Sequence, residues 1–270
     1  MAMPAYPNHA KRRLQDGQLS LGIGLRQART VDIATVAHAC GFDWLFIDME
    51  HNSMGVDTAA QISMAALQAG VTPIVRVPGH EHFHASRLLD AGALGVVVPH
   101  VDTPEQAARV VAHCRFPPAG RRSVPGMLPQ VGFEPLPVAQ LIREVNEATL
   151  VVVMLETPEA IEKADSIAAV AGIDVLLIGA NDLAAEMGIP GEFAHARMEA
   201  AFRDAIAACR RHGKYPGMGG IYEHGLMARY IELGARFILS GSDLSFMIAG
   251  AKARTSYLHA LALDPGHAFA

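Results

Sequence analysis

The chain has 270 residues, of which 51% are apolar and 18% charged, and its net charge is −5 at pH 7. This composition supplies a large core, and it argues against a disordered chain and against nucleic acid as a partner. Three scattered cysteines without a CxxC spacing exclude a disulfide framework and a cysteine-based zinc site. The first residues show no signal-peptide pattern, and no run approaches the ~20 apolar residues of a membrane helix, so we expect a cytoplasmic protein with no membrane partner.

One pattern recurs along the chain: a helical segment ends at a glycine, and an apolar run begins about two residues later. The glycine stands where a helix C-cap favours a left-handed residue. The run that follows is rich in Val, Ile and Leu without alternation, which is typical of a strand buried on both faces. These runs, with two further ones, predict strands over 19–25, 43–49, 72–77, 95–100, 150–156, 174–179, 215–221 and 237–241.

Helical patterns separate the expected strands, for example over residues 58–68, 103–114 and 198–211. Eight strands that alternate with helices predict an α/β fold, a (β/α)8 TIM barrel, and we expect a single domain over residues 1–270. A doubly wound sheet is the alternative, and it fits less well because no GxGxxG opens the first helix.

Two segments predict contacts between subunits. Residues 115–137 form a long Pro-rich stretch, and a loop of this length in a compact domain is usually functional or buried in a subunit contact. The last helical pattern carries Phe246, Met247 and Ile248, which a monomer would find hard to cover together. We therefore expect a homo-oligomer that uses the loop and the C-terminal helix.

Titratable side chains gather where the expected strands end, which is where a TIM barrel holds its chemistry. They are Asp48, Glu50, His51, Arg76, His100, Glu156 and Asp182. Glu156 and Asp182 follow adjacent strands, and two such carboxylates with water suit a hard divalent cation such as Mg²⁺ or Mn²⁺. A helix is expected to begin after Gly179, so that the N–H groups of Ala180 and Asn181 could hold a small carboxylate beside the cation.

Arg76 lies in an otherwise apolar strand and needs a carboxylate partner such as Glu50, an anionic ligand, or both. His51 is the candidate acid or base, because the acids before it could orient its ring. We interpret His100 as a packing residue. The glycine-rich ends of the last two strands, "GMGG" and "SGSDLS", leave phosphate binding open as an alternative.

The positions of the lysines limit the possible chemistry. The chain has four, Lys11, Lys163, Lys214 and Lys252, and none falls at the C-terminal end of an expected strand. An aldolase that forms a Schiff base needs a lysine there. If the reaction is carbon–carbon cleavage, the electron sink must therefore be a metal.

The chain resembles the metal-dependent (class II) pyruvate aldolases of the HpcH/HpaI family, which include aldolases of hydroxyketoacids and 2-keto-3-deoxy sugar acids. The motifs "DWLFIDMEH", "PIVRVP", "LLDAG", "VVPHVDTPEQA", "RFPPAGRR", "MLET" and "IGANDLAAEMG" follow the family's order. The resemblance implies a TIM barrel, a divalent cation (Mg²⁺, Mn²⁺ or Co²⁺) and a trimer-based hexamer.

The resemblance also implies roles for individual residues. Glu156 and Asp182 would bind the metal, and Arg76 would bind the carbonyl oxygen of pyruvate and stabilise the enolate. His51 would be the acid/base, acting through a metal-bound water, with Asp90 as its partner. The backbone of Gly179, Ala180 and Asn181 would bind the pyruvate carboxylate, and Asp48 and Glu50 would support these groups from behind.

Four positions depart from the family's usual residues: Met154 for Gln, Gly24 for Trp, Gly219 for a larger apolar residue and Ser123 for Gly. The two glycines suggest a wide aldehyde pocket at the ends of strands one and seven, across the mouth from the metal, where Arg26 could meet a polar or anionic tail of the aldehyde. Loops that refill the space are the alternative.

We therefore predict a lyase that reversibly cleaves a 4-hydroxy-2-oxoacid to pyruvate, or hydroxypyruvate, and an aldehyde through a metal-stabilised enolate. The alternatives are a CoA-thioester lyase of the citrate-lyase β or malyl-CoA type and a non-catalytic binding protein on the same scaffold. The first would need an adenine and pyrophosphate site, and the chain shows no basic cluster beyond "GRR".

Overall fold

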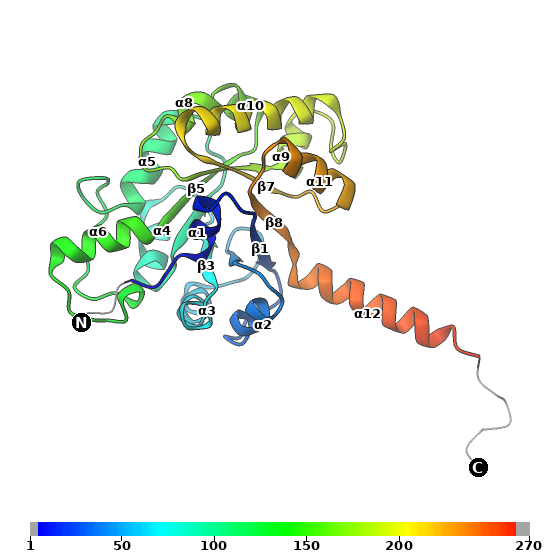
Figure 1. Ribbon diagram of the computed structural model, residues 1–270, viewed down its shortest axis with the longest axis horizontal. Helices are drawn as coiled ribbons and strands as arrows, with labels where there is room; N and C mark the ends of the chain where they lie inside the picture. Colours follow the sequence, from blue (N-terminus) through cyan, green and yellow to red (C-terminus); the bar gives the residue numbers. More distant parts are fainter. Residues whose placement is uncertain (1–4, 263–270) are drawn as a thin grey trace, which may run out of the picture.

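The computed structural model describes residues 5–262, and in it eight parallel strands close into a barrel (Figure 1). Each strand pairs with the next along the chain, and β8 pairs with β1. The strands are β1 Ser20–Leu25, β2 Trp44–Asp48, β3 Thr72–Arg76, β4 Gly95–Val98, β5 Leu150–Leu155, β6 Val175–Gly179, β7 Tyr215–Gly219 and β8 Phe237–Ser242. The predicted TIM barrel is confirmed, and each strand lies close to its expected bounds.

Helices connect the strands on the outside of the barrel. They are α1 His9–Gln15, α2 Ile33–Ala39, α3 Val56–Ala69, α4 His82–Asp90, α5 Pro104–Cys114, α6 Val138–Ala148, α7 Pro158–Glu162, α8 Ala164–Ala168, α9 Ala180–Glu186, α10 Ala196–His212, α11 His224–Leu233 and α12 Asp243–His259. The glycine signal works as expected: Gly70 ends α3 with φ of 74°, a backbone conformation that favours glycine.

The apolar side chains form two layers, because successive residues of a strand point to opposite faces of the sheet. Val151 and Val153 face the helices, whereas Val152 and Met154 face the barrel interior. This arrangement explains why the strands lack an apolar–polar alternation: both of their faces are buried.

Aromatic residues and α1 fill the end of the barrel where the strands begin. The Trp44 ring stacks on Phe237 with ring centroids 4.1 Å apart. Gly22 lies between them on β1, and a Cβ there would lie 2.2 Å from the indole ring. Ala10 and Leu14 of α1 belong to the same buried cluster. The barrel therefore opens only at the other end, where the strands finish.

Residues 115–137 fold into a small structure of their own. Phe116, Leu128 and Val131 pack with Leu141 and Val145 of α6 in a separate apolar cluster. A short 3-10 helix, Pro129–Val131, lies within the segment. The segment is thus packed on the outer layer of the barrel, away from the strand ends that form the cavity described below.

Helix α12 leaves the barrel after β8 and extends away from the body of the molecule (Figure 1). None of its 17 residues is buried. Its exposed apolar side chains are Phe246, Met247, Ile248, Tyr257 and Leu258. Among residues 5–262, no helix combines the length and the apolar character that a membrane span requires.

Candidate active site

A cavity of about 520 Å³ lies at the C-terminal ends of the strands. Its walls come from every strand except β4, and from the first turns of α9 and α12. The predicted residues that line it are Asp48, His51, Arg76, Glu156, Gly179, Ala180, Asn181 and Asp182. Five of the seven titratable strand-end residues chosen from the sequence thus line one concave site, and Glu50 and His100 lie outside its lining.

Arg76 forms the centre of a buried ion-pair cluster with Asp48 and Glu50. Its Nε and Nη2 donate to the two Asp48 carboxylate oxygens at 2.9 and 2.7 Å, and its Nη1 lies 2.8 Å from Glu50 Oε2. Arg76 and Asp48 are paired neighbours on β3 and β2. Burial alone would raise the pKa of Asp48, but the hydrogen bonds and charge of Arg76 outweigh burial and lower it.

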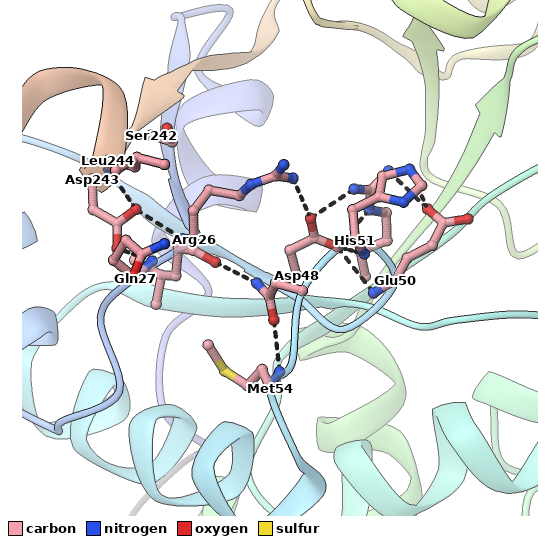
Figure 2. Close-up of polar contacts among 12 residues, drawn as sticks. Arg26, Gln27, Asp48, Glu50, His51, Met54, Ser242, Asp243 and Leu244 are labelled. Atoms are coloured by element: carbon pink, nitrogen blue, oxygen red, sulfur yellow. Dashed lines mark hydrogen bonds and ion pairs between the residues drawn. The ribbon is translucent and has the colours of Figure 1, made fainter. Parts of the chain in front are cut away.

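Glu50 also connects two histidines to this cluster. His51 Nε2 lies 3.6 Å from Glu50 Oε2, and His100 Nε2 lies 3.6 Å from Glu50 Oε1. Figure 2 shows His51 and Glu50 side by side beyond Asp48. Glu50 is thus the carboxylate beside the His51 ring, within ion-pair distance but without a hydrogen bond to it.

His100 is not the packing residue that the sequence suggested. Its side chain is 54% exposed, its φ is 52°, and its Nδ1 lies 3.3 Å from Glu156 Oε2. Its backbone N–H donates to the same oxygen at 2.8 Å. Positive φ is uncommon outside glycine, so this backbone conformation is maintained by the surrounding contacts. His100 links Glu50 to Glu156 at the edge of the site.

Glu156 is a buried carboxylate that has no Lys or Arg partner among residues 5–262, and its nearest basic group is His100. Glu156 is 1% exposed, and burial raises its pKa to about 7, against the opposing effect of the His100 N–H group. The Asp182 carboxylate raises the pKa further, which places the two acids within electrostatic reach of each other. A Cβ at position 179 would lie 2.5 Å from Glu156 Oε1, so Gly179 makes room for this carboxylate.

Asp182 lies in the first turn of α9, which begins directly after Gly179. Ala180 and Asn181, which directly precede Asp182 in the sequence, also line the cavity. In residues 5–262, no three His, Cys, Asp or Glu side chains form a metal-binding group. Glu156 and Asp182 are thus two carboxylates of this site without a third such side chain beside them in the part of the chain that the structure describes.

Asp90 lies away from the site within one chain. Helix α4 returns from the end of β3 to the start of β4, so its last residue, Asp90, lies at the opposite end of the barrel from the cavity. There its carboxylate accepts from Arg122 Nη2 at 2.6 Å. Within one chain helix direction separates His51 from Asp90, so their pairing stays a prediction.

The loop after β1 carries Arg26 into the cavity. The Asp243 carboxylate at the start of α12 accepts from the backbone N–H groups of Arg26, Gln27 and Ala28 at 2.7–3.0 Å (Figure 2). Arg26 Nη1 donates to Asp48 Oδ2 at 3.0 Å. Sequence reasoning missed Asp243 and the cavity-lining Tyr222, although both follow strands closely.

The four departures from the family pattern lie in different places. Met154 and the glycines at 24 and 219 line the cavity, whereas Ser123 is exposed on the 115–137 segment. Leu239 lies 3.7 and 3.6 Å from the Cβ positions of Gly24 and Gly219, so it fills part of the space that the glycines leave. Gly219 is also the register partner of Gly179 and so lies closer to the carboxylate side than expected.

The phosphate alternative loses support at the start of α12. The N–H of Ser245 donates to the Ser242 hydroxyl, and the N–H of Leu244 donates to Asp243 Oδ1. These groups are therefore already occupied, and the adjacent Asp243 carboxylate would repel a phosphate.

Comparison with known proteins identifies the family. The family model of HpcH/HpaI aldolase/citrate lyase matches residues 26–249. The chain belongs to this family. It is 39% identical over 266 residues to the 4-hydroxy-4-methyl-2-oxoglutarate aldolase tasA of Hapsidospora irregularis, covering 97% of this chain and 98% of that protein.

A bacterial relative and a solved structure agree with this assignment. The 4-hydroxy-2-oxo-heptane-1,7-dioate aldolase of Salmonella arizonae is 37% identical over 247 residues, covering 91% of this chain and 92% of the relative. The crystal structure of an HpcH/HpaI aldolase from Desulfitobacterium hafniense superposes with a TM-score of 0.87 at 28% identity, over 93% of this chain and 97% of that one. The prediction of a class II aldolase, a carbon–carbon lyase, is confirmed.

Proposed function

We propose that this HpcH/HpaI protein cleaves 4-hydroxy-2-oxoacids between C3 and C4 and releases pyruvate, or hydroxypyruvate, and a carbonyl compound. The observation that carries the proposal is that one cavity holds two carboxylates with no Lys or Arg partner among residues 5–262, together with a buried arginine that retains unused donors. The relatives whose names specify 4-hydroxy-2-oxoacid substrates cover nearly the whole chain, which supports the same reaction.

Glu156 and Asp182 fit a divalent cation. A buried carboxylate whose pKa is raised by desolvation is stabilised by a nearby positive charge, and both acids offer the oxygen ligands that Mg²⁺, Mn²⁺ or Co²⁺ binds. When bound, the cation would supply Lewis-acid stabilisation of negative charge on the substrate's oxygens.

Arg76 would stabilise the oxygen that becomes negative when the C3–C4 bond breaks. Asp48 accepts from two of the five N–H donors of its guanidinium, and Glu50 forms an ion pair with it without a hydrogen bond, so Nη1 and the second N–H of Nη2 remain for the C2 oxygen of the substrate. The two acids hold the guanidinium in place, so that little reorganisation is needed as charge develops. The N–H groups of Ala180 and Asn181, with the small residue Gly179, would bind the C1 carboxylate beside it.

His51 would take the proton of the C4 hydroxyl. The hydroxyl loses its proton as the C4 carbonyl forms, and the electron pair of the broken bond becomes the pyruvate enolate, which is then protonated at C3. The His51 side chain is 51% exposed at the mouth, and Glu50 is placed to stabilise its protonated form.

We propose further that the chain forms a homo-oligomer, with the resemblance pointing to a trimer-based hexamer, and that α12 packs on a second copy. An isolated helix with five exposed large apolar residues and no buried ones is not stable on its own. Ser245 and Ile248 of α12 line the cavity, so this contact would border the active site. Light scattering should give a multimeric mass, and a monomer at working concentration would refute the proposal.

The activity is tested by coupled detection of pyruvate from 4-hydroxy-4-methyl-2-oxoglutarate, the substrate in the name of the fungal relative. We expect pyruvate release with added Mg²⁺ or Mn²⁺ and its loss after exhaustive chelation. Full activity without metal, or substrate trapped on a lysine by borohydride, would refute the proposal. The single-barrel organisation over 1–270 and the cytoplasmic location remain predictions.

A further inference from the structure

Arg26 lies across the cavity from the two candidate metal ligands. It follows β1, and Glu156 follows β5, four strands away in a closed ring of eight, so the two side chains come from opposite sides of the barrel mouth. Both line the same cavity. A 4-hydroxy-2-oxoacid that places its C1 carboxylate at the N–H groups of Ala180 and Asn181 and its C2 oxygen at Arg76 would direct C4 and its substituents toward Arg26.

The Arg26 guanidinium has donors to spare. Of its five N–H donors, only those on Nη1 have a protein partner in residues 5–262, namely Asp48 Oδ2 at 3.0 Å. The Arg26 side chain is 41% exposed, whereas Asp48 is 2% exposed. Arg76 already binds both Asp48 oxygens, so Asp48 does not depend on Arg26, and an exposed single contact of this kind is weak.

The backbone beneath Arg26 is fixed, although its side chain is only loosely held. Asp243 accepts from the N–H of Arg26 and of the next two residues, which pins the loop to the start of α12. Figure 2 shows the Arg26 side chain extending from this anchor toward Asp48. A fixed base and an exposed head suit a residue that binds a ligand, because little backbone order is lost on binding.

The surroundings of Arg26 favour a small charged group over a long apolar one. Gly24, Gly241 and Ser242 line this side of the cavity, and the Tyr222 ring lies within electrostatic reach of Arg26. A carboxylate matches the fork of a guanidinium with two parallel hydrogen bonds. The glycines leave room beside it for a second substituent on C4.

We propose that Arg26 binds a second carboxylate, carried on C4 of the substrate, and so selects acceptors that are 2-oxoacids over simple aldehydes and ketones. The proposal rests on the aldolase function above. The substrate class is a 4-carboxy-4-hydroxy-2-oxoacid, and cleavage converts its C4 half into a second 2-oxoacid while the C3 half leaves as pyruvate.

The test compares two substrates that differ in one group. They are 4-hydroxy-4-methyl-2-oxoglutarate and 4-hydroxy-4-methyl-2-oxopentanoate, in which a methyl group replaces the second carboxylate. Arg26→Gln should lower kcat/KM for the dicarboxylate by roughly 10–100-fold, chiefly through KM, and leave the monocarboxylate unchanged. Arg26→Lys should fall between, because it keeps the charge and loses the fork.

Arg29→Gln is the matched control, since Arg29 lies on the same loop but binds backbone carbonyls of Ala28 and Arg26 outside the cavity. An equal change for both substrates in Arg26→Gln, or the same selective loss in Arg29→Gln, would overturn the assignment while pyruvate release by the wild type keeps the aldolase function. If the wild-type protein cleaves neither compound, both proposals fail. Circular dichroism of each variant confirms that it is folded.

Discussion

Two buried carboxylates at the barrel mouth, Asp48 and Glu156, have opposite pKa shifts. At the ends of β2 and β3, Asp48 is paired with Arg76, and this contact lowers its pKa. At the ends of β5 and β6, Glu156 is equally buried but has no such partner, and its pKa rises to about 7. The β2–β3 side is complete within the described residues, whereas the β5–β6 side would, on the function proposed above, be completed by a bound cation, and this difference separates a positioning cluster from a proposed binding site.

Removing the charge of Glu156 should have the largest effect on turnover. Glu156→Gln keeps the shape of the side chain but removes the negative charge, so we expect turnover to fall on the order of 10³ or more. Metal binding, measured by calorimetry, should weaken in parallel. Glu159→Gln, on the exposed side of α7, is the control and should retain both properties. Unchanged metal affinity in Glu156→Gln would remove Glu156 from the ligand set.

Weakening the Arg76–Asp48–Glu50 cluster should have the next largest effect on turnover. Arg76→Lys keeps a positive charge but cannot bind Asp48 and Glu50 together with a substrate oxygen, so we expect kcat to fall on the order of 10²–10³ in a folded protein. Arg122→Lys replaces a buried arginine outside the cavity and should retain kcat. Near-normal turnover of folded Arg76→Lys would mean that the β2–β3 cluster is purely structural.

A larger side chain at Gly219 should leave both the Arg76 cluster and the Glu156 carboxylate intact. Gly219→Leu adds a side chain next to Leu239, and we expect a selective loss of kcat/KM for bulky acceptors worth about 1–3 kcal/mol. Aldol addition to pyruvate with a small and a bulky aldehyde measures this discrimination. If both aldehydes lose equally, Gly219 acts through its neighbour Gly179 on the donor side and does not line the acceptor pocket.

The pH dependence of the free energy of unfolding should reveal the opposite pKa shifts of Glu156 and Asp48 without any assay of activity. In the metal-free protein Glu156 has a higher pKa when folded, about 7, than the ordinary value of 4.5, so the folded state binds the extra proton between these values. The free energy of unfolding should therefore decrease as pH rises from about 4.5 to 7, by a few kcal/mol, and stay low above that range. Asp48 acts oppositely, since its lowered pKa favours the folded state above pH 4 or so.

Urea unfolding at a series of pH values measures this slope. Glu156→Gln should be flatter than the wild type between pH 4.5 and 7 and at least as stable near pH 7, because it removes a buried charge. A slope that is identical in the variant would show that another group carries it.

The barrel and most of the site could be predicted from the sequence, because both follow from local order. A glycine that ends a helix and a doubly buried strand after it are signals within a few residues, and the last residues of parallel strands must meet at one end. The pairing of Asp48 with Arg76 was also within reach: the two are register partners, whereas Glu50 lies two residues further on.

What the sequence did not reveal depends on direction and on distant contacts. Asp90 stands in a persuasive motif, but the direction of α4 carries it to the other end of the barrel. His100 resembles any lone histidine until its backbone N–H is seen to bind Glu156. The apolar residues of α12 predicted a helix and a contact, although they could not predict that the helix extends away from its own barrel.

The single tryptophan provides an optical probe of the barrel's last step of assembly. Trp44 stacks on Phe237 across the glycine of β1, so its ring touches the first and the last parts of the sheet at the seam where the barrel closes. Its emission should shift to shorter wavelength when Phe237 of β8 packs on it and the barrel closes. Because the ring lies at the end of the barrel away from the cavity, the same signal should be insensitive to substrate and metal, which makes fluorescence a measure of folding that is independent of catalysis.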